Sequence, residues 1–159
     1  MRSVLFVCTA NICRSPMAVG LFTNLAKQRQ ANWQIGSAGV YAREGYPAAQ
    51  YTLQVLSERG IELPNHRSQG ITPEIIADYQ LILTMEKGHK EVLAAAFPAE
   101  YRKIFLLTEI VGENRDIVDP IGSSLIEYED TAREIQSILS RGFKRMIVLT
   151  NPQAGIVGR

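Results

Sequence analysis

The feature that most constrains the fold is a short apolar run near the N-terminus, followed soon afterwards by a helical pattern. The run Val4–Val7 has no polar alternation, which is typical of a strand buried on both faces of a sheet. Pro16 then suits the first turn of a helix, because its missing N–H would have no partner there. Apolar residues recur at helical spacing to about Lys27. A doubly covered strand beside a helix predicts an α/β fold with a parallel sheet.

The rest of the chain repeats this alternation of strands and helices. Strands are predicted at 33–37, 79–84 and 101–107, and helices at 47–59, 73–77, 86–97 and 125–139. The segment 36–39 is interpreted as a turn, and 143–150 fits either a continued helix or a further strand. No linker divides the chain, so we expect a single domain over 1–150 and a flexible tail over 151–159.

The composition argues against several classes of partner. The chain has 17 Lys and Arg against 16 Asp and Glu, a formal net charge of +1, whereas nucleic-acid and membrane-surface binders carry a basic excess. No stretch has the length of a transmembrane helix, and the first apolar run is too short for a signal peptide. We therefore expect a cytoplasmic protein, where thiols stay reduced. Cys8 and Cys13 form neither a disulfide framework nor a zinc motif, and we expect no metal or other cofactor.

Cys8 and Arg14 bracket the segment that carries chemistry. Cys8 ends the first predicted strand, five residues follow, and Arg14 opens the helix. Such a loop can curl around one tetrahedral anion with its backbone N–H groups inward, and the helix N-terminus adds partial positive charge. Arg14 can donate two N–H groups to phosphate oxygens, and these donors favour a thiolate on Cys8, ready for in-line attack. The alternative, a small buried strand cysteine, leaves Arg14 and the polar Thr9 and Asn11 unexplained.

Asp119 is the candidate for the proton donor that a departing phenol needs. Pro120 restricts Asp119 to extended geometry on a loop after the last predicted strand, which favours the ligand-binding side of the sheet. The Asp119-Pro120 pair would equally suit a turn before the last helix, and Asp116 is a rival acid.

The segment 5–18, LFVCTANICRSPMA, resembles the opening of low-molecular-weight protein tyrosine phosphatases. Weaker matches lie at 37–39, 60–61, 66–67, 83–85 and 119–120, and the resemblance runs from about Val4 to about Leu139. It implies a single Rossmann-like domain with a central four-stranded parallel sheet and helices on both faces. It also implies a metal-independent hydrolysis of phosphotyrosine-type monoesters, in proteins or small aryl phosphates, that releases inorganic phosphate. Cys8 would become a phosphocysteine while Asp119 protonates the leaving phenol and then activates water.

The resemblance implies a role for each residue of the phosphate-binding loop. Ser15 would donate a hydrogen bond to the Cys8 thiolate, and Cys13 would form a reversible disulfide with Cys8 that protects it from over-oxidation. Asn11 would hold the loop shape in a left-handed conformation, which Asn tolerates. The remaining members of the loop are Thr9, Ala10 and Ile12.

Outside the loop, Ser37 and His66 would brace Asn11, and the slot for the substrate ring would be lined by Ile12, Tyr41 and Ile121. The chain departs from the family pattern at four positions, one of which, Val19 where Glu is frequent, lies on the first helix away from the reacting atoms. Ala10 stands where Gly is usual, Ile121 where an aromatic residue is frequent, and Ala49 where Asp is common. A lost aromatic wall would weaken aryl phosphate binding by roughly 0.5–1.5 kcal/mol.

Three other functions agree with part of the sequence. Arsenate reductases share this loop but need more cysteines than Cys8 and Cys13. A branch of protein-arginine phosphatases carries Thr at the position of Ile12, where an apolar side chain suits an aromatic ring. The third is an oxyanion-binding regulatory module of the same fold with weakened catalysis, motivated by Ala10, Ile121 and Ala49. The expected oligomeric state is a monomer or a weak dimer.

Overall fold

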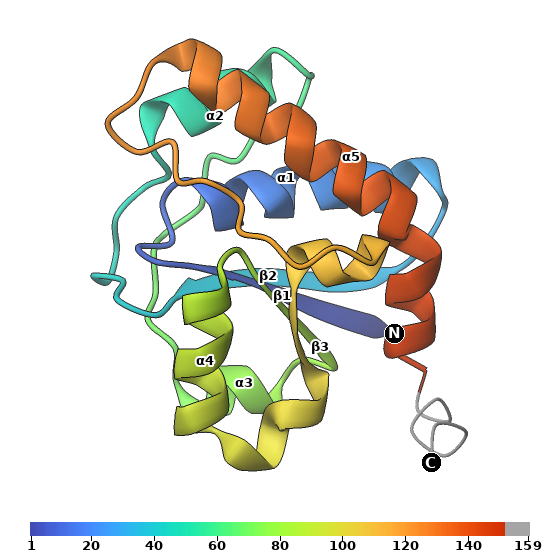
Figure 1. Ribbon diagram of the computed structural model, residues 1–159. Helices are drawn as coiled ribbons and strands as arrows, with labels where there is room; N and C mark the ends of the chain where they lie inside the picture. The colour runs from blue at the N-terminus through green and yellow to red at the C-terminus, as the bar shows by residue number, and fades with distance from the viewer. Residues whose placement is uncertain (152–159) are drawn as a thin grey trace.

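Four parallel strands form the centre of the protein, in a computed structural model that describes residues 1–151 (Figure 1). The strands are β1 (Arg2–Cys8), β2 (Trp33–Gly39), β3 (Leu81–Thr84) and β4 (Ile104–Leu106). They pair in the order β2-β1-β3-β4, and every pair is parallel. The predicted α/β class and the parallel four-stranded sheet are confirmed. The predicted tail lies, from 152 onward, outside the described residues.

Helices cover both faces of the sheet (Figure 1). One layer contains α1 (Arg14–Gln28), α2 (Gln50–Ser57) and α5 (Leu125–Leu149), which pack on one another. The opposite layer contains α3 (Pro73–Ala77) and α4 (Lys87–Ala96), while the 3-10 helices η1 (Pro98–Lys103) and η2 (Leu107–Val111) flank β4. No helix among residues 1–151 is long and apolar enough to cross a membrane.

The strand β1 is buried on both faces, as its unbroken apolar run predicts. Val4 and Phe6 belong to the core beneath α1 and α5, whereas Leu5 and Val7 belong to the core beneath α3 and α4. Because successive side chains of a strand point to opposite faces, Cys8 follows Val4 and Phe6 onto the side of α1. The nucleophile candidate therefore lies directly below the helix that Arg14 opens.

Two predicted segments near the site are wrong in their boundaries. The expected turn at 36–39 is strand, because β2 pairs with β1 in register as far as Gly39 and Cys8. The expected helix at 47–59 begins only at Gln50. Its preceding residue, Ala49, is the N-cap: its carbonyl accepts the N–H of Leu53 at 3.0 Å and its own N–H donates to the carbonyl of Ile12 at 2.8 Å, so it joins the helix to the loop.

The bounds of two further segments differ from the predicted ones, one at the far end of the sheet and one in the C-terminal helix. The strand predicted at 101–107 shortens to Ile104–Leu106, because a 3-10 helix occupies Pro98–Lys103. The ambiguous segment 143–150 is helical, since α5 runs unbroken to Leu149 and buries Phe143 and Met146.

The sheet places the end of β1 at a change in strand order. The chain leaves β1 to form β2 on one side and later returns to form β3 on the other. Ligands of open α/β sheets bind beyond the carboxyl ends of the strands at such a point. Cys8 is the last residue of β1.

Candidate active site

The segment Thr9–Cys13 forms a loop between β1 and α1 whose carbonyl groups point outward. The carbonyl oxygens of Cys8, Thr9 and Ile12 accept backbone N–H groups at 2.8–3.0 Å. The donors are Val40, Tyr41 and Ala49, in that order. The carbonyl of Asn11 accepts from His66 Nε2 at 2.7 Å.

The backbone N–H groups of the loop therefore face inward. In a planar trans peptide the N–H points away from the preceding carbonyl, so outward carbonyls imply inward N–H groups at the residues that follow them. Successive N–H groups around a concavity bind anions. The first turn of α1, which starts at Arg14, adds N–H groups that lack helical partners. The loop is built to hold an anion above Cys8.

Asn11 sets the curvature of this loop. Its φ of 60° lies in the left-handed region, and its side chain is completely buried. Nδ2 donates to Ser15 Oγ at 2.8 Å and to Ser37 Oγ at 2.9 Å, while Oδ1 accepts the backbone N–H of Gln69 at 3.0 Å. The structure thus brings Ser37 and His66 beside Asn11. Gln69 is a third brace, and no sequence motif indicates its role.

Ser15 contacts the sulfur of Cys8. The two atoms Ser15 Oγ and Cys8 Sγ lie 2.9 Å apart, and both residues are buried. Because Ser15 Oγ already accepts from Asn11 Nδ2, its own hydrogen is free to point at the sulfur. A hydroxyl hydrogen in that position stabilises negative charge on Cys8.

Arg14 is buried and joins the loop to the segment that carries the acid. Nη1 donates to the carbonyl of Ile117 at 2.6 Å, and Nη2 lies 2.7 Å from Glu86 Oε2 and 3.3 Å from Asp119 Oδ2. Among the side-chain nitrogens and oxygens of residues 1–151, Arg14 Nε is the buried one without a hydrogen-bond partner. An unpaired buried donor is costly, and Arg14 lines the small pocket above Cys8. An anion bound in that pocket would give this donor a partner.

A second layer around Arg14 comes from α4 and was missed by the sequence analysis. Glu86 donates its backbone N–H to His89 Nδ1 at 3.1 Å, so the ring hydrogen lies on Nε2, which donates to Thr9 Oγ1 at 2.8 Å. Burial lowers the pKa of His89 below its ordinary 6.5, against the opposing effect of the Glu86 carboxylate. The signal was present, since Glu86 precedes the helix and His89 follows three residues later, as in a capping box.

Of the two rival acids, Asp119 lies in the pocket. Its Oδ1 accepts the N–H of Ile121 at 3.1 Å, and its side chain stays one-third exposed at 34%. Asp116 instead accepts the backbone N–H of Lys87 at 2.7 Å, at the start of α4. The pocket above Cys8 is lined by Asp119 and Ile121 but not by Asp116.

The small pocket opens beside a larger one. This second pocket, of about 240 Å³, shares Ala10 and Ile12 with the first and is otherwise lined by Tyr41, Arg43, Tyr46 and Ser68. Of the predicted slot residues, Ile12 lies at the junction, Ile121 in the first pocket and Tyr41 in the second. Ala10 is not among the described non-glycine residues with positive φ, so it carries no left-handed strain.

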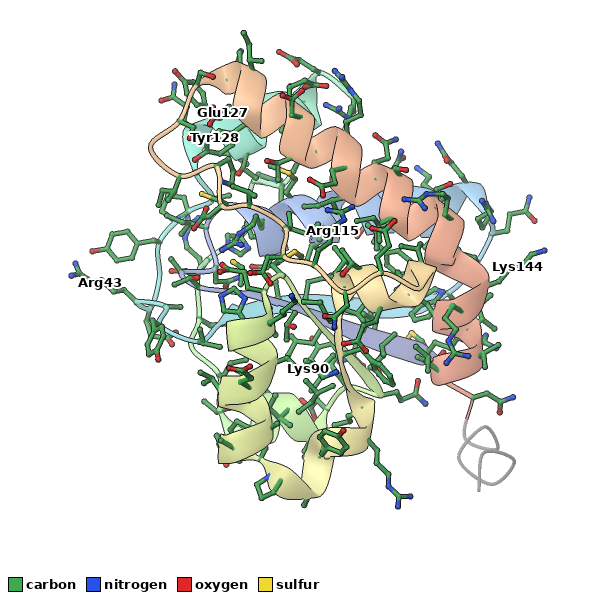
Figure 2. The ribbon with its side chains drawn as sticks, viewed as in Figure 1. Arg43, Lys90, Arg115, Glu127, Tyr128 and Lys144 are labelled. Atoms are coloured by element: carbon green, nitrogen blue, oxygen red, sulfur yellow. The ribbon has the colours of Figure 1, made fainter. Side chains whose placement is uncertain are left out.

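Cys13 lies on the outer side of the loop, against α5. Its Sγ is 3.3 Å from the hydroxyl of Tyr128, in the first turn of α5 (Figure 2). Burial raises the pKa of the Cys13 thiol to about 11, so this thiol is protonated at neutral pH. Both cysteines are free.

Comparisons with known proteins agree with this geometry. Residues 3–147 match the model of a family described as low molecular weight phosphotyrosine protein phosphatase. A protein-arginine-phosphatase of Bacillus subtilis is 37% identical over 144 residues, which cover 90% of this chain and 95% of that protein. The crystal structure of a low molecular weight protein tyrosine phosphatase from T. tengcongensis aligns with a TM-score of 0.88 at 38% identity, covering 91% of this chain and 99% of that one. A mutant of the YwlE arginine phosphatase with a phosphorylated active-site serine also aligns at 0.88, with 35% identity and coverage of 91% and 95%.

Proposed function

This chain belongs to the low molecular weight phosphotyrosine protein phosphatase family, and from that membership we propose that it hydrolyses phosphotyrosine in proteins through a phosphocysteine at Cys8. The observation that carries the proposal is the loop itself. Its outward carbonyls, the left-handed Asn11 and the unpaired Nε of Arg14 together form an anion site directly above a sulfur that Ser15 contacts.

In the first step the Cys8 sulfur attacks the phosphorus atom bound in the loop. The S–P bond forms as the bond from phosphorus to the phenolic oxygen breaks, and the phenolic oxygen takes the proton of Asp119. Arg14 and the loop N–H groups stabilise the charge that spreads over the phosphoryl oxygens. The phosphorylated active-site serine in the related arginine phosphatase supports a covalent intermediate at this position.

In the second step Asp119, now a carboxylate, removes a proton from water as the water oxygen attacks phosphorus. The S–P bond breaks, inorganic phosphate leaves, and the electron pair returns to Cys8. The Ser15 hydroxyl, 2.9 Å from the sulfur, stabilises the departing thiolate. The Arg14 contacts to Asp119 and to the Ile117 carbonyl support this role for Asp119, because they hold the acid loop against the anion site.

Phosphotyrosine is favoured over phosphoarginine by the walls of the pocket. A guanidinium leaving group brings several N–H donors that need acceptors, whereas a phenol ring needs apolar walls. Ile12 and Ile121 line the pocket above Cys8, and Tyr41 lines the adjoining one. The relatives include both arginine and tyrosine phosphatases, and these two leaving groups are the alternatives that the experiment compares.

The experiment compares hydrolysis of para-nitrophenyl phosphate, a phosphotyrosine peptide and the matched phosphoarginine peptide, with metal chelated. We expect turnover of the first two to exceed that of the third, and Cys8→Ser to abolish all of it. Equal rates on both peptides would refute the substrate assignment. Folded wild-type protein that binds vanadate without turnover would instead support the regulatory binding module.

The acid is tested with a matched pair of carboxylates three residues apart. Asp119→Ala should lower kcat for the phosphotyrosine peptide by about 10²–10⁴-fold and leave vanadate binding largely intact, whereas Asp116→Ala should act far less. The opposite order would move the role of acid to Asp116.

The proposal also covers the cellular compartment and the oligomeric state in which the enzyme works. A phosphatase that depends on a reduced Cys8 needs a reducing compartment, which supports the cytoplasmic location that the sequence predicts. A monomer or weak dimer is consistent with an enzyme whose proposed catalytic groups all come from one chain.

A further inference from the structure

The larger pocket beside the anion site has the composition of a protein-recognition surface. Tyr41 and Tyr46 line it and are 73% and 51% exposed. Arg43, also exposed, lies between them in sequence and lines the same pocket. Tyr and Arg are enriched among the residues that dominate binding energy at protein interfaces. No step of the proposed hydrolysis uses Arg43 or Tyr46.

The loop that carries these three residues is held in place by hydrogen bonds to Ser68. The buried Ser68 donates its hydroxyl to the carbonyl of Arg43 and accepts the N–H of Tyr46 at 2.9 Å. Two backbone bonds add to this, from Gly45 to the Ser68 carbonyl at 2.8 Å and from Ser68 to the Tyr46 carbonyl at 2.7 Å. A surface fixed in this way loses little conformational entropy when it binds.

The loop is also joined to the phosphate-binding loop. Tyr41 donates its backbone N–H to the carbonyl of Thr9 at 2.9 Å, and Ala10 and Ile12 line both pockets. The two pockets therefore adjoin, so that residues next to a phosphorylated side chain in the first pocket are within reach of the second.

The charge of the second pocket is set by Arg43. The guanidinium has no ion-pair partner among residues 1–151, and it projects from the body of the protein (Figure 2). The adjacent carboxylate of Glu44 is directed elsewhere, since its Oε1 accepts the N–H of Gly70 at 2.8 Å. No other lining residue of this pocket is charged.

We infer that this pocket, through Arg43 with Tyr41 and Tyr46, binds an acidic residue that flanks the phosphotyrosine of the substrate protein. The inference rests on the proposed function, because it takes the phosphorylated side chain to lie in the loop above Cys8. It assigns the enzyme a preference for phosphotyrosine in acidic surroundings.

The test measures binding, so that it does not depend on turnover. Three peptides carry the non-hydrolysable phosphotyrosine analogue phosphonomethyl-phenylalanine, flanked on both sides by Glu, by Ala or by Lys. We expect wild-type protein to bind the Glu peptide about two- to fivefold more tightly than the Ala peptide, the range of an exposed ion pair. This preference should shrink as salt is raised.

Arg43→Gln should abolish the preference, and Arg43→Glu should reverse it in favour of the Lys peptide. Lys144→Gln is the matched control, because it removes one exposed cation from α5, far from the pocket (Figure 2). It should keep the preference intact. Tyr46→Ala should weaken binding of all three peptides.

Each result has one consequence. If wild-type protein binds the three peptides equally, or if Arg43→Gln and Lys144→Gln behave alike, the acidic-residue site is refuted. In that case para-nitrophenyl phosphate turnover lost in Cys8→Ser would still uphold the proposed function. A protein that binds none of the peptides refutes the acidic-residue site, and one that also lacks turnover refutes the proposed function too.

Discussion

Asn11 meets two demands at one position. Its backbone adopts φ 60°, and its side chain makes hydrogen bonds to Ser15, Ser37 and Gln69. Asn visits this region more readily than other non-glycine residues, and a short amide can both donate and accept. The loop shape therefore depends on a residue that combines conformational tolerance with three buried contacts.

Replacing Asn11 separates these demands. Asn11→Gly tolerates the left-handed backbone and loses the side-chain bonds, whereas Asn11→Ala loses these bonds and also strains the left-handed backbone. We expect both variants to lower the free energy of unfolding, with Ala lower than Gly by about 1 kcal/mol because of left-handed strain. Urea denaturation measures the difference. Equal stability of the two variants would mean that the loop relaxes out of this conformation.

The start of α4 links a helix cap to the anion site. His89 accepts the N–H of Glu86 through Nδ1 and donates to Thr9 through Nε2, an arrangement that only the neutral ring allows. Arg14, Glu86, Asp116 and Asp119 surround it, and burial, the largest effect, lowers its pKa below 6.5. The unfolded chain therefore binds a proton here at a higher pH than the folded chain.

This difference predicts how stability depends on pH. Since the folded pKa is depressed, the stabilisation from neutral His89 is fully present above 6.5 and is lost as the pH falls below that value. His89→Gln should accordingly be most destabilising near pH 7.5, and the gap from wild type should narrow by pH 5. Denaturant titrations across that range measure the gap. A gap that stays constant would show that His89 does not titrate differently in the folded state.

The elements also show what the sequence could and could not predict. The apolar run of β1, and Pro16 with the helical spacing of apolar residues in α1, are local signals, and both elements were predicted correctly. The end of β2 and the start of α2 were misplaced, because long-range bonds to the phosphate-binding loop decide them. The loop residues could be named from their spacing and from the family resemblance. The contacts of Glu86, His89 and Gln69 with the loop could not be predicted, because tertiary packing alone makes them; the spacing of Glu86 and His89 indicates only a helix start.

At the scale of the whole molecule, α5 spans one layer and closes over η2. Gly142 lies in the middle of this helix, where glycine normally costs about 1 kcal/mol relative to alanine. A Cβ at this position would overlap the side chain of Ile110 in η2. The close approach of α5 to η2 therefore requires glycine at this position.

Gly142→Ala tests this packing. We expect it to lower the free energy of unfolding by about 1–3 kcal/mol, the usual cost of overpacking, in spite of the better helix propensity of alanine. Gly88→Ala in α4 is the matched control, because nothing lies within 4 Å of the added Cβ, and it should not destabilise. Thermal or urea unfolding of both variants decides the matter, and a stabilised Gly142→Ala would contradict the expected overlap.

The contact of Arg14 with Ile117 and Asp119 has a consequence for biosynthesis. A ribosome makes Cys8 early and Asp119 late, and the partners that turn the loop carbonyls outward, from Val40 to His66, emerge between them. A nascent chain therefore exposes the Cys8 thiol before the residues that shape the anion site have been made. Those residues are in turn made before Asp119, the proposed acid. Under the proposed mechanism, hydrolysis can begin only when Asp119 has left the ribosome, so the activity appears after most of the chain has been synthesised.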